Sequence, residues 1–393
     1  MSFNRAISLG AAVAALAFLF SILISFYSYR FLWVHADRGA FAAWLSVYEL
    51  AQFLLLLDIG FTHSFIKKNI DSDWCEVIRE LPALRGALFL VAMIAAVVVC
   101  ICAYKVGEPA NVGVSSYFYL SLSIVFTLVG YADTAALRLR NKFLNIYLIN
   151  IFSNLIFMIF LHLSIVVDVV ERLAIATLIR SFLQYGLQNF VLGVGLRISL
   201  PNQFTGSLEV VSLNASYFLL FLIDAFVMAA LGVPLAVVAS VIILKKYYDA
   251  LRGLWDSTLG VLAVAFAKID DERRNWIIRL LVVASYVCAW FFSSIIIQLW
   301  LGNRIVDPQL SAGVCVFAIS LTLYRVETTR LYFQGKLGFV KPILAAIGIK
   351  LMFVGLIFAS ILDLKGIYLL QGILIIMTVV FMNWFRSPVL KAA

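Results

Sequence analysis

The residues best suited to do chemistry form a stripe of charge inside a long apolar segment. Four of them recur at helical spacing: Lys245, Asp249, Arg252 and Asp256. At 100° per residue these positions lie within about 60° of one another, on one face of a helix. A charged side chain at the centre of a bilayer costs about 2.5 to 3.5 kcal/mol on insertion scales. The spacing therefore predicts that the stripe faces water or a partner, with Lys246 and Tyr248 beside it.

A second polar face contains no acidic residue. It consists of Thr177, Arg180, Gln184 and Gln188, which recur at i, i+3, i+7 and i+11. Smaller polar groups lie in other apolar segments: Glu49 and Gln52; Ser116, Tyr119, Ser123 and Thr127; Asn214, Tyr217 and Asp224; Arg325 and Glu327; and Lys350. Polar faces in both halves of the chain predict a shared wet cavity.

These charges permit two interpretations. In the first, acids and bases pair across helices and only hold the helices together. In the second, they face water or an anionic substrate, because Lys245, Lys246 and Arg325, near the membrane midplane, have few acidic neighbours at equal depth. Unpaired charge in lipid is expensive, so the set as a whole favours the second interpretation.

The elements that position these residues are expected to be membrane helices. Hydrophobic residues make up 64% of the 393 residues and charged residues 13%, and the mean hydropathy is +1.04. Soluble domains are roughly 25% charged, so the composition indicates an integral membrane protein. The net charge of +9 is attributed to membrane topology and not to nucleic acid binding. The three histidines and five cysteines show no metal spacing, and no cofactor is expected.

Apolar runs separated by polar breaks predict about twelve transmembrane helices. Their ranges are 6–30, 40–66, 83–104, 115–137, 143–167, 172–195, 210–232, 234–266, 276–301, 309–331, 342–362 and 366–385. The break between the seventh and eighth is predicted at Gly232-Val233-Pro234, the only interruption in a long apolar stretch. So many helices leave no room for a soluble catalytic domain.

The chain divides into two predicted six-helix bundles, 1–196 and 210–393, joined by a polar cytoplasmic linker, 197–209. Lysine and arginine concentrate in the even-numbered loops, which places these loops and both termini in the cytoplasm by the positive-inside rule. Weak similarity between the halves matches Asp133-Thr134 with Glu327-Thr328. Because both halves have the same orientation, the repeat would be parallel, about an axis along the membrane normal.

Several short motifs resemble a known family. Leu56-Leu57-Asp58-Ile59-Gly60-Phe61, followed by Phe65-Ile66-Lys67-Lys68, is similar to the Leu-Leu-Asp-x-Gly signature of Wzx-type polysaccharide flippases of the MOP superfamily. Three other places are similar to the same family: Asp224 to Met228, Tyr247-Tyr248 and Leu299-Trp300-Leu301-Gly302. The chain is shorter than many members. Its intramembrane acids also nearly cancel its bases, which departs from the cationic lumen typical of the family.

The resemblance implies an all-α membrane fold in which two six-helix bundles form a V. Members of this family flip undecaprenyl-pyrophosphate-linked oligosaccharides, such as O-antigen repeat units, across the bacterial inner membrane. They do so by alternating access, coupled to H+ or Na+, and they are transporters and not enzymes. A polysaccharide polymerase and a chain-length regulator are the expected partners.

The resemblance also implies roles for the intramembrane polar residues. Those expected to bind pyrophosphate or glycan are Arg180, Gln184, Gln188, Tyr217, Lys245, Lys246, Tyr248, Arg252, Arg325 and Lys350. Those expected to serve ion coupling or gating are Glu49, Asp58, Asp224, Asp249 and Glu327. No residue is expected to bind a metal.

Three other functions remain open. A multidrug and toxic compound extrusion antiporter would share the twelve-helix plan but would export organic cations from a net acidic cavity. A membrane enzyme of polysaccharide assembly, such as a polymerase, ligase or acyltransferase, would carry a long external loop or a His-Asp constellation, and the odd-numbered loops are all short. A structural scaffold would not need charges at the bilayer midplane.

Overall fold

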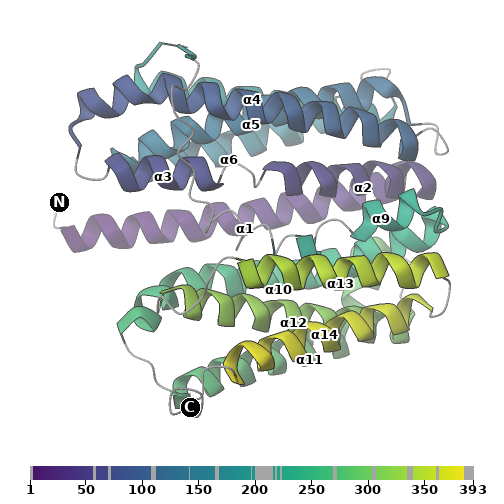
Figure 1. Cartoon of the computed structure of the whole chain (residues 1–393). Helices are drawn as coiled ribbons and strands as arrows, with labels where there is room; N and C mark the ends of the chain where they lie inside the picture. The colour runs from purple at the N-terminus through teal and green to yellow at the C-terminus, as the bar shows by residue number, and fades with distance from the viewer. Residues whose placement is uncertain are drawn as a thin grey trace. The chain divides into compact units, whose positions relative to one another are not determined.

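The computed structural model shows the chain as helices joined by short connections (Figure 1). The described residues are 3–55, 59–69, 72–107, 112–140, 142–163, 168–195, 197–199, 216, 219–221, 224–268, 272–302, 307–333, 340–359 and 363–384. These residues form thirteen helices. The chain divides into two compact units, Met1–Val211 and Ser212–Ala393. The extent of the linker, 197–209, stays a prediction, because most of it lies outside the described residues.

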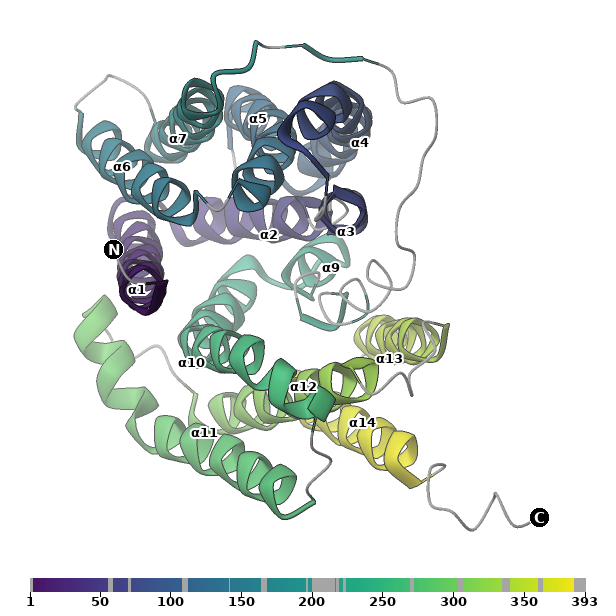
Figure 2. The ribbon, with the colours of Figure 1, turned by 90° about the vertical axis from the view of Figure 1, so that its left-hand side faces the viewer.

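The N-terminal unit has seven described helices. They are α1 (Phe3–His35), α2 (Arg38–Leu55), α3 (Ile59–Asn69), α4 (Trp74–Gly107), α5 (Val114–Leu139), α6 (Phe143–His162) and α7 (Val169–Leu192). In Figure 2, α5 lies between α4 and α7 and packs against both. α6 packs against α7 and α1. α5 is therefore the central helix of this unit.

The C-terminal unit has six described helices. They are α9 (Asp224–Ala230), α10 (Leu235–Lys268), α11 (Glu272–Leu301), α12 (Pro308–Phe333), α13 (Val340–Ala359) and α14 (Leu364–Trp384). α12 packs against α10, α11 and α14, and α13 packs against α14. α12 therefore has the central position here that α5 has in the N-terminal unit.

Local sequence explains several helix ends. The Asp168 side chain caps α7 by accepting a hydrogen bond from the backbone N–H of Val170 at 3.0 Å. Gly193 follows α7 with a φ of 66°, a left-handed conformation that glycine adopts without strain. Gly232 has a φ of 79° in the turn between α9 and α10. This turn confirms the predicted break at Gly232-Val233-Pro234.

Ten of the twelve predicted spans each coincide with one described helix. The predicted span 40–66 corresponds to α2 and α3, and residues 56–58 between them, which include Asp58, lie outside the described residues. Of the predicted span 210–232, the structure describes residues 216, 219–221 and 224–232, and the last of these ranges contains α9. Tyr217 and Asn214 therefore also lie outside the described residues.

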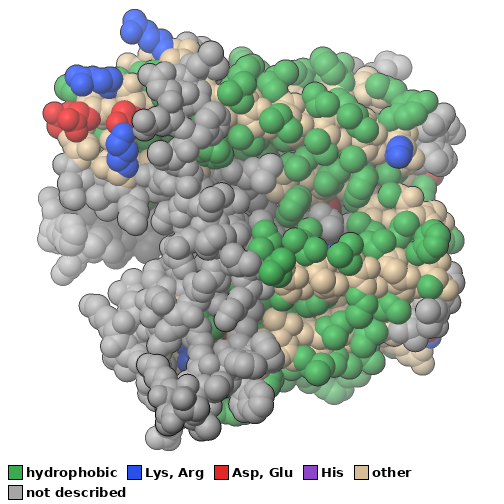
Figure 3. Space-filling view, in the orientation of Figure 1, with side chains coloured by type: hydrophobic (Ala, Val, Ile, Leu, Met, Phe, Trp, Pro, Cys, Tyr) green, Lys and Arg blue, Asp and Glu red, His purple; other side chains and the backbone are tan. Residues whose placement is uncertain are grey.

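The outer surface of α4 shows why the protein suits a bilayer. One face is buried in the unit and carries Leu88, Ala92, Ala95 and Val99; the other is exposed and carries Met93, Ile94, Val97 and Ile101. Figure 3 shows hydrophobic side chains over much of the visible described surface. A helix that is apolar all round is expected where lipid replaces water. Within the described residues, six helices are long and apolar enough to span a membrane, so the predicted total of twelve stays a prediction.

The two units repeat one packing pattern and one ion pair. Arg85 of α4 pairs with Asp133 of α5, and Arg279 of α11 pairs with Glu327 of α12. In both pairs the base precedes the acid by 48 residues. The central helices also make equivalent contacts, since α5 packs against α7 as α12 packs against α14. These matches show that the two units share a local packing pattern, while the axis and orientation of the predicted repeat stay a prediction.

A close helix contact in the C-terminal unit depends on Gly372. A Cβ at this position would lie 3.2 Å from the Cα of Phe317 and 3.1 Å from Cγ1 of Val316. We expect Gly372→Ala to destabilise the protein by about 1 to 3 kcal/mol, because α12 and α14 would have to separate. The loss is measured as a lower unfolding temperature in detergent.

Gly355→Ala in α13 is the matched control for this substitution. A Cβ at Gly355 would meet nothing within 4 Å, so alanine there is expected to be neutral or to stabilise by up to about 1 kcal/mol. An equal loss of stability in both variants would contradict the close-contact explanation.

Candidate functional site

The N-terminal unit contains a cavity of about 300 Å³ between α2, α5, α6 and α7. Ligand pockets usually measure about 300 to 1,000 Å³, so this volume falls at the lower end of that range. Its polar lining comes from all four helices: Gln52 of α2; Ser123 and Thr127 of α5; Asn150 of α6; and Thr177, Arg180, Ser181, Gln184 and Gln188 of α7. The acid-free polar face of the sequence therefore lines this cavity along its whole length.

Arg180 gives the cavity its charge. It is the only ionic side chain in the described lining, which contains no carboxylate. The half-buried Arg180 side chain makes no hydrogen bond or ion pair within the described part of the chain. Its guanidinium group therefore has donors available for an anion or for water. Such a cavity suits an anionic or hydroxyl-rich group and disfavours an organic cation.

Gln188 supplies a second unsatisfied polar group. Its Nε2 donates a hydrogen bond to Oγ1 of Thr134 at 2.9 Å. The side chain is buried, and its Oε1 has no hydrogen-bond donor among the described residues. A buried acceptor without a donor costs about 1 to 3 kcal/mol, so water or a ligand is expected to donate to it. Gly130 leaves room for this oxygen, since a Cβ there would lie 3.2 Å from it.

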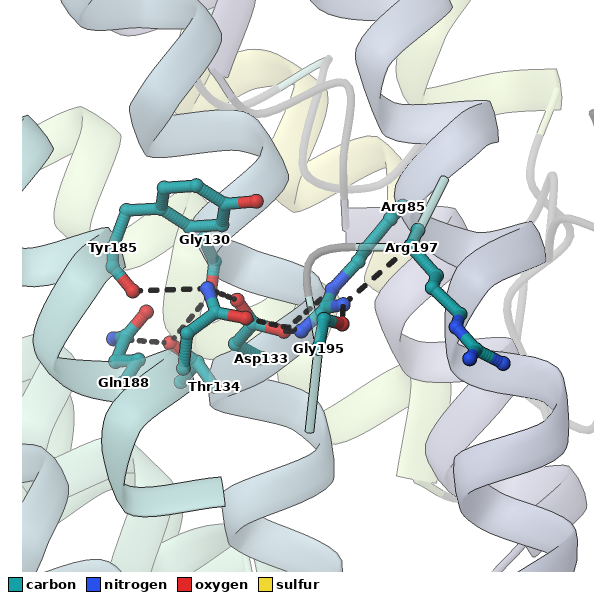
Figure 4. Close-up of polar contacts among 9 residues, drawn as sticks. Arg85, Gly130, Asp133, Thr134, Tyr185, Gln188, Gly195 and Arg197 are labelled. Carbon is teal, nitrogen blue, oxygen red and sulfur yellow. Dashed lines mark hydrogen bonds and ion pairs between the residues drawn. The ribbon is translucent and has the colours of Figure 1, made fainter. Parts of the chain in front are cut away.

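A buried network joins α5 and α7, two of the helices that line the cavity, to α4 (Figure 4). The Arg85 guanidinium of α4 donates to Oδ1 of Asp133 at 2.6 and 2.9 Å, and to Oδ1 of Asn189 of α7 at 2.6 Å. Asn189 Nδ2 donates in turn to Oδ2 of Asp133 at 2.8 Å. Arg85 and Asp133 are fully buried. The network therefore ties α4, α5 and α7 together through three polar side chains.

The same arginine also holds the chain beyond α7. Its Nη1 donates to the carbonyl oxygen of Gly195 at 2.9 Å, and the backbone N–H of Ser199 donates to the carbonyl oxygen of Pro82 at 3.0 Å.

Sequence reasoning did not select Arg85 or Asn189 as site residues. The sequence does show Arg85 as a single charge in the apolar run of α4. Its partners, Asp133 and Asn189, lie 48 and 104 residues away along the chain, so the sequence did not reveal the network.

In the C-terminal unit a second cluster surrounds Asp224. This side chain is fully buried at the start of α9 and forms ion pairs with Lys350 of α13 and, at 4.0 Å, with Lys245 of α10. Lys245 Nζ also donates to the carbonyl oxygen of Phe221 at 2.5 Å. The ammonium of Lys350 lies 4.9 Å from the ring centre of Phe353. Three helices are therefore connected through one carboxylate.

The middle of the charged stripe on α10 is paired within the helix, at Asp249. Asp249 accepts from Nζ of Lys246 at 3.3 Å and from Nε of Arg252 at 2.5 Å. The side chain of Asp256 lies outside the described residues. The expectation that Lys245 and Lys246 have few acidic neighbours is wrong. The acid for Lys245 comes from another helix, α9, and the acid for Lys246 lies one turn along its own helix.

Six predicted site residues remain, and the structure describes four of them. Glu327 is buried and pairs with Arg279 and, through Oε2, with Arg330 at 2.9 Å. Tyr248 is buried with its hydroxyl 3.0 Å from Oγ of Ser311. Glu49 is buried but is absent from the described lining of the cavity, and Arg325 is half-buried. Tyr217 and Asp58 lie outside the described residues.

No known family model and no curated protein sequence matches the chain. Several solved structures are similar to it. A multidrug resistance MATE family transporter of the MOP superfamily, in an inward-facing conformation, matches with a TM-score of 0.58 at 16% identity, over 92% of this chain and 93% of that one. The lipid II flippase MurJ matches with a TM-score of 0.61 at 15% identity, over 94% of this chain and 86% of that one. The chain has the fold of MOP-superfamily transporters.

A third similar structure extends this comparison. The MATE transporter VcmN of Vibrio cholerae matches with a TM-score of 0.56 at 12% identity, over 99% of both chains. The MOP fold thus occurs in drug exporters and in a lipid flippase, all of them membrane transporters. The fold alone does not select between these cargoes, so the choice depends on the residues of the site.

Lys350 tests whether the buried cluster in the C-terminal unit stabilises the protein. We expect Lys350→Met to lower the free energy of unfolding by about 3 to 5 kcal/mol, because one partner of a buried ion pair is removed. Asp224→Asn combined with Lys350→Met should recover part of this loss. Thermal unfolding in detergent measures both effects.

Lys365→Met provides the control at a surface ion pair. Lys365 lies 3.7 Å from Asp363 and is partly exposed, and exposed pairs contribute about 0 to 1 kcal/mol. If Lys350→Met changes the unfolding temperature no more than Lys365→Met does, the buried cluster is not a stabilising element.

Proposed function

We propose that this protein flips a lipid-linked oligosaccharide, an undecaprenyl-pyrophosphate-linked repeat unit of O-antigen or another surface polysaccharide, across the bacterial inner membrane. It acts by alternating access, without a cofactor, and with both termini in the cytoplasm. The observation that carries this proposal is the cavity of the N-terminal unit. There Arg180 lies among amide, hydroxyl and aromatic side chains and no described carboxylate.

The chemistry of this cavity supports a glycan head group. Sugars present hydroxyl groups that both donate and accept, and the amides of Gln52, Gln184 and Gln188 can do the same. Tyr131 and Tyr185 add aromatic surface to the lining. Pockets that recognise small molecules combine apolar walls with a few placed polar groups, and this cavity has both.

A drug antiporter is the competing function, because the MATE transporters have the same fold. The lysines of the C-terminal unit no longer argue against it, since Lys245 and Lys350 are paired with Asp224. The charge of the N-terminal cavity does argue against it. An organic cation would lie beside Arg180 with no described carboxylate in the lining to balance its charge.

Coupling to H+ or Na+ belongs to the same proposal, and the paired acids are its candidates. Asp224, Asp249 and Glu327 each contact basic side chains, and Asp224 and Glu327 do so across helices. Neutralising Asp224 would release the lysines of α10 and α13 from the carboxylate of α9. Such a change can couple an ion to helix movement. Glu49 and Asp58 are the other candidates, and a polymerase and a chain-length regulator are the proposed partners.

The proposal is tested in proteoliposomes that carry a short-chain polyprenyl-pyrophosphate oligosaccharide in the outer leaflet. Protein-dependent protection of the glycan from an impermeant glycosidase is the expected result. Arg180→Gln should slow protection by about tenfold or more, since a hydrogen bond to a charged group contributes about 1.5 to 3 kcal/mol. Arg180→Lys should keep part of the rate.

Phe190→Leu is the matched control on the same helix. Phe190 is 83% exposed and does not line the cavity, so its replacement should leave the rate unchanged. Absence of protection with the wild-type protein, together with efflux of an organic cation from the same vesicles, would replace the flippase with the antiporter.

A further inference from the structure

A smaller chamber of about 70 Å³ adjoins the cavity of the N-terminal unit. The two spaces share three lining residues, Tyr48, Thr177 and Arg180, so they meet at the Arg180 side chain. A water molecule occupies about 30 Å³ of liquid. The smaller chamber therefore has room for one compact polar group, while the larger cavity has room for the rest of a head group.

The hydrogen-bonding character of the small chamber is unusual, because three of the six hydroxyl groups in its lining already donate their protons to helix carbonyls. Three serines of α1 line it at i, i+4 and i+7: Ser21, Ser25 and Ser28. Ser21 Oγ and Ser28 Oγ donate to the carbonyl oxygens of Ala17 and Ile24, each at 2.8 Å. Ser21 Oγ also accepts from Nδ2 of Asn154 at 3.4 Å, which leaves it one lone pair. Thr177 Oγ1 donates to the carbonyl oxygen of Leu173 at 2.8 Å. A hydroxyl has one proton, so these three groups offer the chamber only lone pairs.

Donors at the junction come chiefly from Arg180. Its guanidinium carries five N–H groups and the only positive charge in the described lining of either space. The Ser25 and Tyr48 hydroxyls, which make no hydrogen bond with the described part of the chain, are the further donors. A ligand that fits must bring an anionic acceptor to Arg180 and its own donors to Ser21 and Ser28.

This requirement discriminates between the acidic groups of a lipid-linked oligosaccharide. Pyrophosphate brings acceptors alone, so any of its oxygens beside Ser21 and Ser28 would face lone pairs with no proton between them. A sugar carboxylate brings an anion together with neighbouring hydroxyl donors. Planar bidentate pairing with a carboxylate is also the geometry that arginine favours.

Aromatic side chains complete the chamber. Trp44 and Tyr48 both line it, with ring centres 6.3 Å apart and planes inclined by only 23°. Tyr29 lines it as well. Rings of this kind offer apolar surface to the C–H face of a sugar.

We propose that the junction at Arg180 is a subsite for an acidic sugar. The guanidinium binds the sugar carboxylate, and the serines of α1 accept from its hydroxyls. The substrate class of the chain is then lipid-linked oligosaccharides that contain a uronic acid or a similar sugar acid. This inference rests on the proposed flippase function, and it assigns Arg180 to the glycan and not to the pyrophosphate.

The first test compares two polyprenyl-pyrophosphate oligosaccharides that differ only in one residue, glucuronic acid or glucose. In proteoliposomes the wild-type protein should protect the glucuronic acid form at least tenfold faster. Arg180→Gln should abolish this preference by slowing the acidic substrate to the rate of the neutral one, and Arg180→Lys should keep part of it. Phe190→Leu should keep both rates.

The second test measures binding without transport and therefore does not depend on flippase activity. Methyl glucuronide, methyl glucoside and inorganic pyrophosphate are each added to the purified protein in detergent, and the heat of binding is recorded by calorimetry. Methyl glucuronide should bind to the wild-type protein and to Phe190→Leu but not to Arg180→Gln. Equal unfolding temperatures of the three proteins would show that Arg180→Gln still folds.

The outcomes separate the two proposals. Equal transport of both oligosaccharides, or pyrophosphate binding that depends on Arg180, would overturn the acidic-sugar subsite and leave the flippase standing. Binding of glucuronide without transport of either oligosaccharide would support the subsite and reject the flippase. Failure of methyl glucuronide to bind would reject the subsite whatever the transport result.

Discussion

Charge inside an apolar helical bundle needs a partner, because an ion that is left unpaired there costs several kcal/mol. This constraint organises both units of the protein. The central helix of each carries a buried acid, Asp133 or Glu327, and the preceding helix supplies an arginine at the same spacing. The ion pair fixes how each of the two helices is rotated about its own axis. That rotation determines which way the other polar side chains of the helix point.

The constraint is met differently in the two units. In the C-terminal unit, Asp224 binds Lys245 and Lys350, and Asp249 binds Lys246 and Arg252, so the described bases of these clusters have acids. In the N-terminal unit, Arg180 lies on a cavity whose described lining contains no acid. In the C-terminal unit, charges are therefore neutralised in ion pairs between and within helices. In the N-terminal unit, the guanidinium group of Arg180 is available to bind a ligand or water.

The sequence predicted the parts of this structure that depend on local periodicity. Helical spacing placed Arg180, Gln184 and Gln188 on one face, and that face lines the cavity. The only break in a long apolar stretch placed the turn at Gly232. Local periodicity could not predict which side chains form ion pairs or hydrogen bonds between different helices. Lys350 and Asp224 are 126 residues apart, and nothing in the local spacing of either residue indicates the other.

The polar residues that sequence reasoning overlooked have the same explanation. Arg85 stands as one polar residue in an apolar run, and Asn189 directly follows Gln188. Neither pattern distinguishes a chance interruption from a buried network. Periodicity shows which way a side chain points from its own helix, but not what another helix places opposite. Charge balance at a site, and with it the class of ligand, therefore appears only when the helices are packed.

Cargo selection in this fold follows from that packing. The similar structures include MATE transporters, one of them a multidrug resistance transporter, and a lipid II flippase, so the helical framework is compatible with more than one kind of cargo. What distinguishes one cargo from another is the sign of the unpaired charge on the cavity and the supply of hydrogen-bond donors around it. Here the unpaired charge is the guanidinium of Arg180. The hydroxyls of Ser21, Ser28 and Thr177 nearby already donate hydrogen bonds to helix carbonyls. A cation would meet an uncompensated positive charge, and a group with acceptors alone would meet oxygen lone pairs. A group that is both acidic and rich in hydroxyls satisfies the guanidinium and the serine oxygens together.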